Sequence, residues 1–176
     1  MFHREIPVFL FTGFLESGKS TFILDTLHQD YFATGERTLI IACEEGEAEY
    51  DKNELRELNT YVEYIENEED ITKELLASWN SSYKPRRVLI EYNGMWDVNE
   101  ILEDVYPDNW VLTQVISTVD YTTFNMYWSN MRSMVMNQLS MSDMVIFNRC
   151  DATTKRNDLR RSIKLFNKKA QVAYDW

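Results

Sequence analysis

The feature that most constrains the fold is the segment 13–20, G-F-L-E-S-G-K-S, which fits the phosphate-binding pattern G-x-x-x-x-G-K-[ST] at every fixed position. A near-continuous apolar run, residues 6–12, precedes it, and such runs are typical of strands buried on both faces of a parallel sheet. Apolar residues at helical spacing follow it within residues 19–28. An ordinary glycine turn is the alternative, but the order of strand, loop and helix favours a P-loop.

Each fixed position of this loop has a physical role. Gly13 and Gly18 permit the backbone angles that curl N–H groups around a phosphate. Lys19 is expected to place its cation on the β- and γ-phosphates, and the Ser20 hydroxyl to ligate Mg²⁺. The helix that follows directs its N-terminus at the anion. The predicted nucleotide contacts in this segment are Gly13, Glu16, Ser17, Gly18, Lys19, Ser20 and Thr21.

The rest of the chain alternates predicted strands and helices. Further strands are expected at residues 37–43, 61–65, 87–92, 111–119, 144–147 and 170–174. Helices are expected near residues 55–58, from Asn67 through Trp79, and at residues 98–105, 121–139 (as one helix or two) and 153–167. This alternation predicts one α/β domain over residues 1–176, a doubly wound, mostly parallel sheet in the three-layer α/β/α arrangement of P-loop NTPases. Ligands of such sheets bind at the carboxyl ends of the strands.

A second motif, N-R-C-D at residues 148–151, directly follows one of these predicted strands. It is similar to the guanine-recognition pattern N-K-x-D, with Arg149 in the lysine position. Asp151 can accept hydrogen bonds from guanine N1–H and its 2-amino group, and such a site rejects the wrong base by roughly 10⁴-fold in favourable cases. Asn148 is expected to tie this segment to the P-loop or the base, and the stem of Arg149 to cover a base face. The alternative is that Asn148 and Asp151 only cap the following helix.

Two acidic segments lie between these motifs. Glu91 ends the strand predicted at residues 87–92 and Gly94 follows, which suits a carboxylate for the Mg²⁺ shell and a backbone N–H that reaches the γ-phosphate. A strand-end glutamate followed by a turn is the alternative. Residues 44–51, E-E-G-E-A-E-Y-D, are expected to form a switch segment with Glu44 or Asp51 near the metal, or else a solvated acidic loop.

The net charge and the composition of the chain limit the classes of partner that it can bind. The net charge of −11 over 176 residues argues against a nucleic-acid partner, because an acidic chain repels phosphate backbones. No signal peptide and no apolar run of the roughly 18 residues that span a bilayer are found, so we expect no membrane association. Two cysteines far apart in sequence suit a reducing cytoplasm.

Taken together, these motifs resemble those of the CobW-like GTPases, relatives of HypB and UreG, over nearly the whole chain. The resemblance is carried by IPVFLFTGFLESGKST, by CEEGEAEYD (similar to N-E-x-G-x-x-x-x-D), by VLIEYNGMWD, by STVDYTTF and by residues 138–151 (similar to Q-x-x-x-x-D and N-K-x-D). It implies GTP or GDP with Mg²⁺ as ligands, and a role in metal or cofactor handling resembling that of a metallochaperone.

Two departures from the family pattern stand out. The family usually carries C-x-C-C after the switch region, where thiolates hold a metal, but the corresponding residues 61–70 contain no cysteine. A carboxylate site made from Glu66, Glu68, Glu69 and Asp70 is conceivable, although such a run more often begins a solvated helix. Many family members also continue into a C-terminal domain; this sequence ends at Trp176, so we expect either a minimal G domain or a part of a longer protein.

The leading functional hypothesis is slow GTP hydrolysis used as a switch, with Lys19, Glu91 and Gly94 as the catalytic residues. No convincing residue orients the attacking water; Glu44, Asp51 and Asp97 are candidates, which predicts a low intrinsic rate raised by dimerisation or a partner. The alternatives are a nucleotide-dependent binding module without hydrolysis and a small-molecule P-loop kinase. A methionine-rich stretch, residues 126–144, suggests core packing or a surface for a client protein or homodimer.

Overall fold

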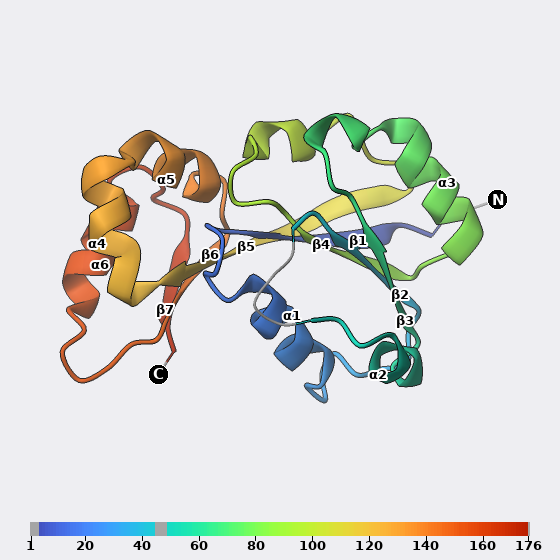
Figure 1. Cartoon of the computed structure of the whole chain (residues 1–176), viewed down its shortest axis with the longest axis horizontal. Helices are drawn as coiled ribbons and strands as arrows, with labels where there is room; N and C mark the ends of the chain where they lie inside the picture. The colour runs from blue at the N-terminus through green and yellow to red at the C-terminus, as the bar shows by residue number, and fades with distance from the viewer. Residues whose placement is uncertain (1–3, 45–48, 176) are drawn as a thin grey trace.

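The apolar runs form a parallel β-sheet at the centre of the structure, a computed structural model that describes residues 4–44 and 49–175. The strands are β1 (Ile6–Thr12), β2 (Thr38–Ala42), β3 (Thr60–Tyr64), β4 (Arg87–Glu91), β5 (Trp110–Asp120), β6 (Met144–Asn148) and β7 (Gln171–Tyr174). Within the described residues the sheet has seven strands in the order β3-β2-β4-β1-β5-β6-β7, and each neighbouring pair is parallel (Figure 1). The predicted doubly wound α/β fold is therefore confirmed.

Helices cover both faces of this sheet. They are α1 (Lys19–Leu27), α2 (Lys52–Glu57), α3 (Lys73–Tyr83), α4 (Tyr121–Asn130), α5 (Arg132–Leu139) and α6 (Arg156–Lys164), together with the 3-10 helices η1 (Glu68–Asp70) and η2 (Val98–Ile101). Helices α1 and α2 lie on one face, and α3, η2 and the group α4 to α6 lie on the other (Figure 1). The molecule thus has three layers, helix, sheet and helix.

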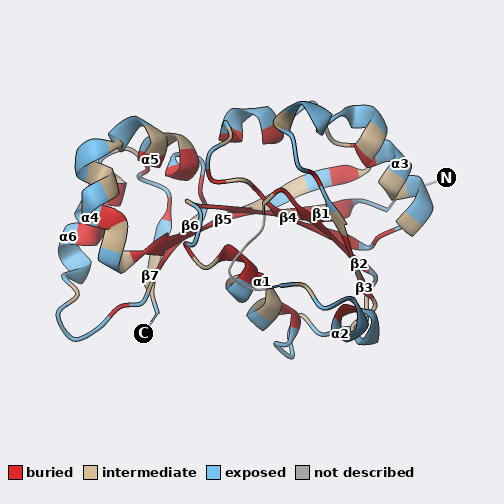
Figure 2. Ribbon diagram, in the orientation of Figure 1, coloured by how far each residue is buried: buried red, intermediate tan, exposed pale blue. Residues whose placement is uncertain are grey.

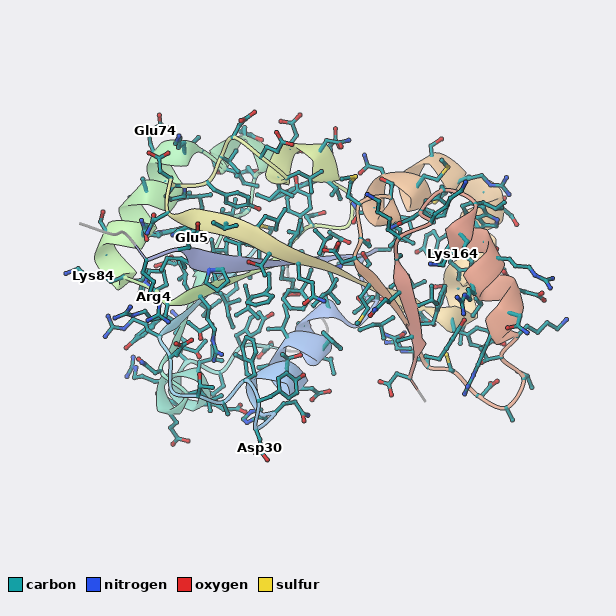
Figure 3. All side chains as sticks on the ribbon, turned by 180° about the vertical axis from the view of Figure 1, so that it is seen from behind. Arg4, Glu5, Asp30, Glu74, Lys84 and Lys164 are labelled. Carbon is teal, nitrogen blue, oxygen red and sulfur yellow. The ribbon has the colours of Figure 1, made fainter. Side chains whose placement is uncertain are left out.

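Strand β1 shows why the central strands contain few polar residues. Val8 and Leu10 point into the core under α3 and η2, whereas Phe11 points into the core formed with α1 and α2. A strand buried on both faces needs apolar side chains in both registers. The central strands are accordingly buried along most of their length, while the outer faces of the helices are exposed (Figure 2). Charged side chains such as Asp30, Glu74 and Lys84 project from the rim of the molecule (Figure 3).

The prediction of a helix starting at Asn67 is wrong about the start. Residues 68–70 form only η1, and α3 begins after Thr72, whose hydroxyl accepts a hydrogen bond from the Leu75 N–H at 3.1 Å. The Asn67 amide instead donates to the Asp70 carboxylate at 3.2 Å. Both residues can cap a helix, and the extended backbone of Thr72 marks the true boundary.

Two other predicted helices are shorter than expected. The helix expected at residues 98–105 is reduced to η2, and Asp104 adopts a left-handed backbone with φ of 64° shortly after it. The helix expected from residue 153 begins at Arg156, because the Asp151 carboxylate accepts from the Thr153 N–H and holds a turn there. The long helical segment 121–139 is two helices, which meet at Met131.

Parallel pairing gathers the strand ends that carry the predicted motifs. Glu91 pairs with Phe11 of β1 and with Ala42 of β2, and Asp120 pairs with Asn148 of β6. The carboxyl ends of β2, β4, β1, β5 and β6 therefore share one edge of the sheet, where this class of fold binds ligands. Within the described residues, no helix is both long and apolar enough to cross a membrane.

Candidate nucleotide-binding site

The loop between β1 and α1 has the curled backbone that a phosphate-binding loop needs. Gly13, Glu16 and Gly18 have φ of 128°, 61° and 94°, in the region that side chains disfavour. The Ser17 N–H donates to the Phe14 carbonyl at 3.1 Å and closes the turn. Such consecutive left-handed and right-handed residues turn their N–H groups toward a common anion.

Lys19 and Ser20, the first two residues of α1, are both buried, whereas Thr21 is exposed. The Lys19 ammonium donates to the carbonyls of Gly13 at 2.7 Å and Phe14 at 2.9 Å. It also forms an ion pair with Glu44 at 2.5 Å between Nζ and Oε1. The lysine is therefore folded back over its own loop, with three acceptors around one ammonium.

Gly94 lies directly against the P-loop. A Cβ atom at this position would lie 2.6 Å from the Gly13 carbonyl oxygen and 2.8 Å from the Leu15 nitrogen, distances that real side chains do not reach. Only glycine allows this approach, and it places the Gly94 N–H within 3.0 Å of Glu44 Oε2. The segment after β4 and the P-loop thus share one small volume, as the E-x-x-G prediction requires.

Glu91 is fully buried at the end of β4. Its Oε2 accepts from the Tyr50 hydroxyl at 2.8 Å, whereas Oε1 has no hydrogen-bond partner among the described residues. Burial raises the pKa of this carboxyl to about 7, although the Tyr50 hydrogen bond and the Lys19 charge oppose the increase. An unpartnered, buried carboxylate oxygen is costly unless a cation or donor meets it.

The donor set around Glu91 suits a hard cation. Ser20 and Glu91 offer hydroxyl and carboxylate oxygens, the ligands that Mg²⁺ prefers, and both are buried beside the phosphate loop. In the described part of the chain, no group of three or more His, Cys, Asp or Glu side chains is arranged to hold a metal. Mg²⁺ is usually held by one or two carboxylates together with substrate phosphates.

The other proposed carboxylates have different surroundings. Asp51 is exposed and caps α2, where its Oδ1 accepts from the N–H groups of Asn53 and Glu54. Asp97 caps η2, and its Oδ1 also accepts from the Asn137 amide at 2.9 Å, which holds the Asp97 pKa below its ordinary value. Residues 45–48 of the predicted switch segment lie outside the described residues.

The segment after β6 contacts the P-loop through Asn148. Its side-chain amide donates to the Ser17 carbonyl at 2.5 Å, and a Cβ at Gly18 would lie 2.6 Å from the same nitrogen. Asn148 thus makes the contact with the P-loop that was one of its two predicted roles. Its Oδ1 is buried and has no hydrogen-bond partner among the described residues.

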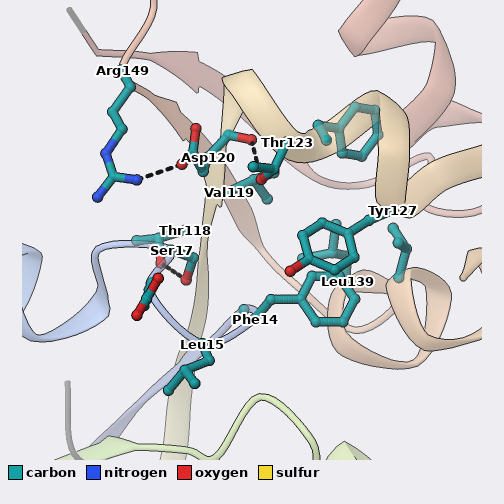
Figure 4. A pocket seen from close by; sticks show the side chains of 14 residues that line it. Phe14, Leu15, Ser17, Thr118, Val119, Asp120, Thr123, Tyr127, Leu139 and Arg149 are labelled. Carbon is teal, nitrogen blue, oxygen red and sulfur yellow. Dashed lines mark hydrogen bonds and ion pairs between the residues drawn. The ribbon is translucent and has the colours of Figure 1, made fainter. Parts of the chain in front are cut away.

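Arg149 and Asp151 leave this segment in different directions. Arg149 has a left-handed backbone with φ of 56°, and its guanidinium forms an ion pair with Asp120 at the end of β5 (Figure 4). Burial raises the pKa of Asp120, but hydrogen bonds from Thr122 and the Arg149 charge outweigh burial and lower it. The Asp151 carboxylate is exposed and accepts from the Thr153 backbone and hydroxyl, which lowers its pKa.

A pocket opens between the P-loop and the group α4 to α5. Arg149, Asp120 and the exposed Glu16 are among its lining residues, and the rings of Phe14 and Tyr127, which also line it, stack with centroids 4.4 Å apart (Figure 4). Ser17 and Thr118 also line the pocket, and their hydroxyl oxygens are 2.9 Å apart. The pocket is continuous with the phosphate loop and bounded by the Arg149 side chain.

Two residues of the site have roles that were not anticipated. Gln138 of α5 is buried, accepts from the Gly13 N–H at 3.1 Å and donates to the Trp96 carbonyl at 3.0 Å. Tyr50 reaches Glu91 from the far side of the acidic segment. Both lie inside motifs that the sequence marks, but contacts between distant segments leave no periodic pattern to detect.

The methionine-rich stretch is partly exposed, and the acidic run, residues 66–70, forms no metal cluster among the described residues. Met126, Met136 and Met141 expose 55%, 38% and 54% of their surface, while Met131, Met134 and Met144 are partly buried. In the acidic run, the Glu68 carboxylate accepts from the Asp97 N–H at 3.3 Å. The described carboxylates of this run do not converge on a common point that could hold a metal.

Comparison with known proteins agrees with this geometry. A family profile described as CobW/HypB/UreG, nucleotide-binding domain, matches residues 7–174. Comparison with curated proteins gives no match.

Among solved structures, the Zn(II)-bound YjiA GTPase from E. coli is similar to this chain, with 24% sequence identity and a TM-score of 0.73 over 97% of this chain. A Zn(II)-bound triple mutant of YjiA has 24% sequence identity and a TM-score of 0.74 over 98% of this chain. The hydrogenase maturation factor HypB from Archaeoglobus fulgidus gives 14% identity and a TM-score of 0.64, covering 97% of this chain and 81% of its own. This chain spans 57% and 58% of the two YjiA chains. At these identities the structures establish a common fold. The profile match covers almost the whole chain, and the chain therefore belongs to the CobW/HypB/UreG family through its nucleotide-binding domain.

Proposed function

We propose that this domain is a Mg²⁺-dependent GTPase that binds GTP and GDP, hydrolyses GTP slowly, and uses its nucleotide state as a switch in metal or cofactor handling or in binding a client protein. The observation that carries the proposal is the convergence of three segments at one edge of the sheet. The P-loop lysine, the Gly94 N–H and the Asn148 side chain all meet within the same loop cluster. Family membership supports guanine as the base.

The residues at this edge have the chemistry that phosphoryl transfer needs. Lys19 supplies a buried cation, and the Gly94 N–H supplies a fixed donor beside it. Such preorganised donors stabilise charge on a transferring phosphoryl group. We assign Ser20 and Glu91 to the metal, because they are buried beside the loop, whereas Glu44 and Asp51 have their carboxylates engaged elsewhere. Bound Mg²⁺ would neutralise phosphate charge.

A low intrinsic rate follows from the state of the candidate water-orienting groups. Glu44 is paired with Lys19, Asp51 caps α2, and Asp97 caps η2 and accepts from Asn137. Each carboxylate is already used, so none is ready to position water in this conformation. A client protein or a second copy of the chain is the partner we propose to complete the site, with the cytoplasm as its compartment.

The experiment is calorimetric titration of GTP and ATP analogues, with Mg²⁺, into wild type and Asp151→Asn. Asparagine keeps an oxygen for the Thr153 turn but loses the second acceptor and the charge that guanine needs. We expect guanine binding to weaken by about a hundredfold or more. Asp158→Asn, an exposed change on α6, is the matched control and should bind as wild type does.

The outcomes separate the competing functions. Equal affinity for ATP would contradict guanine selection and favour a general NTPase or a small-molecule kinase. Binding of GTP without phosphate release would favour a nucleotide-dependent binding module, the second function that the engaged carboxylates support. Loss of both binding and release in Lys19→Ala is expected if the P-loop acts as proposed.

A further inference from the structure

Glu44 is bound by the two donors that the proposed function assigns to a terminal phosphate. Its Oε1 pairs with the Lys19 ammonium at 2.5 Å, and its Oε2 accepts from the Gly94 N–H at 3.0 Å. The side chains of Lys19 and Glu44 are only 1% and 5% exposed. A buried ion pair of this kind persists only when both partners are well satisfied, as they are here.

All three N–H donors of the Lys19 ammonium already have acceptors. An ammonium group carries three N–H bonds, and its acceptors are the Gly13 carbonyl, the Phe14 carbonyl and Glu44. The Gly94 N–H is a single donor, and Glu44 takes it. A phosphate that accepts from Lys19 must therefore displace one of these three acceptors, and a phosphate that accepts from the Gly94 N–H must displace Glu44.

Charge makes the displacement of Glu44 unavoidable for a triphosphate. Two anions cannot share one ammonium in a buried site without strong repulsion, and Glu91 already adds a second carboxyl nearby. The predicted Gly94 contact belongs to the γ-phosphate, so a diphosphate does not need that donor. Glu44 competes with the last phosphate of the ligand and much less with the first two.

We propose that Glu44 is a specificity-determining residue that occupies the binding position of the terminal phosphate. GTP displaces its carboxylate from this position, whereas GDP leaves it in place. This inference rests on the proposed function, because it identifies the binding position of the terminal phosphate from the roles of Lys19 and Gly94. Its consequence is that discrimination between triphosphate and diphosphate is set by competition with a side chain of the same chain. The same displacement links the presence of the γ-phosphate to the position of Glu44.

The test is calorimetry on the full chain with Glu44→Gln, using GDP and a non-hydrolysable GTP analogue, each with Mg²⁺ and with a chelator. Glutamine keeps the shape and the acceptor for Gly94 but removes the charge that holds Lys19. We expect affinity for the GTP analogue to rise by about tenfold, the value of one charge-assisted hydrogen bond, while affinity for GDP changes by less than about threefold. Glu49→Gln, an exposed carboxylate on the same segment, is the control and should leave the ratio of the two affinities unchanged.

Two results would overturn the inference. An equal change for GDP and the GTP analogue would mean that Glu44 acts only through net charge. Weaker binding of the GTP analogue by Glu44→Gln, seen only with Mg²⁺, would make Glu44 a metal ligand instead.

Tripolyphosphate and pyrophosphate lack a nucleobase, so titrating them in the same way tests the terminal-phosphate position independently of base recognition. If wild type binds no guanine nucleotide, the proposed function fails, yet a selective gain for tripolyphosphate in Glu44→Gln would still support the role of Glu44. If this gain in tripolyphosphate affinity is absent as well, both the proposed function and the role of Glu44 are contradicted. Glu44→Ala, which deletes the acceptor as well, should show the same selectivity, so the test does not depend on one variant.

Discussion

At the scale of the residue, Glu91 shows how a functional site departs from the rules of a stable core. It sits in the most buried layer of the sheet, yet one carboxylate oxygen has no hydrogen-bond partner in the described chain. Burial raises its pKa to about 7, and the nearby Glu44 charge adds to this, while Tyr50 and Lys19 act in the opposite direction. A buried group held in this unfavourable state is typical of a site that waits for a ligand.

The Glu91 pKa predicts a pH dependence of folding. The unfolded carboxyl titrates near 4.5 and the folded one near 7, so the folded state binds the extra proton between these values. The free energy of unfolding should therefore fall as pH rises from about 4.5 to about 7, by on the order of 3 kcal/mol from this group. Glu91→Gln lacks this loss, so its stability relative to wild type should be higher at pH 8 than at pH 5.

Urea denaturation of the nucleotide-free protein at the two pH values measures this difference. The exposed carboxylate variant Glu57→Gln serves as the control and should show the same difference from wild type at both pH values. A pH-independent difference for Glu91→Gln would mean that the buried carboxyl ionises at its ordinary pKa.

At the scale of the element, α5 fastens two loops of the site to each other. Gln138 joins the Gly13 N–H to the Trp96 carbonyl, and its own carbonyl accepts from the Thr12 hydroxyl at 2.9 Å. The preceding residue, Asn137, accepts from the Val98 N–H. One turn of helix thus positions both the P-loop and the segment that carries Gly94.

Gln138→Leu tests this fastening. Leucine fits the buried position but leaves the Gly13 N–H and the Trp96 carbonyl without partners, at about 1–3 kcal/mol for each buried group. We expect the free energy of unfolding to fall by about 2–6 kcal/mol and nucleotide affinity to fall with it. Met136→Leu, an exposed change on the same helix, should stay within about 0.5 kcal/mol of wild type in the same urea titration. Unchanged stability in Gln138→Leu would show that water replaces both contacts.

At the scale of the whole molecule, the ligand site ties together parts of the chain that pack in separate cores. Lys19 begins a helix in the core under α1, Gly94 adjoins the core under α3, and Asn148 ends a strand of the core under α4 to α6. A ligand that contacts all three stabilises the whole domain and not a single loop. Binding energy then appears directly as folding stability.

Thermal unfolding should therefore report the nucleotide. With Mg²⁺ and GTP analogue at a hundred times the dissociation constant, stability should rise by about 2.7 kcal/mol, which corresponds to roughly 5–11 °C in Tm for a domain of this size. ATP at the same concentration should produce little change, and Asp151→Asn should lose the guanine effect. An equal shift with ATP would contradict base selection.

Local sequence determined much of this protein. Each of its clearest motifs consists of consecutive residues: the P-loop, the buried strands and the segment 148–151. Their backbone preferences and apolar runs could therefore be recognised without knowledge of the segments that pack against them. Local sequence does not determine every helix end, because Asn67 and Thr72 can both cap a helix and the choice between them depends on packing.

Only the tertiary structure decided which strands are neighbours and which side chains meet. Strand β4 lies between β1 and β2, so Glu91 and Gly94 reach the P-loop, although some 70 residues separate them from it in sequence. The pairing of Glu44 with Lys19 and the bridge made by Gln138 depend on this strand order. The physical reason is that periodicity and turn chemistry act over a few residues, whereas lateral strand order is fixed by burying whole faces of elements against one another.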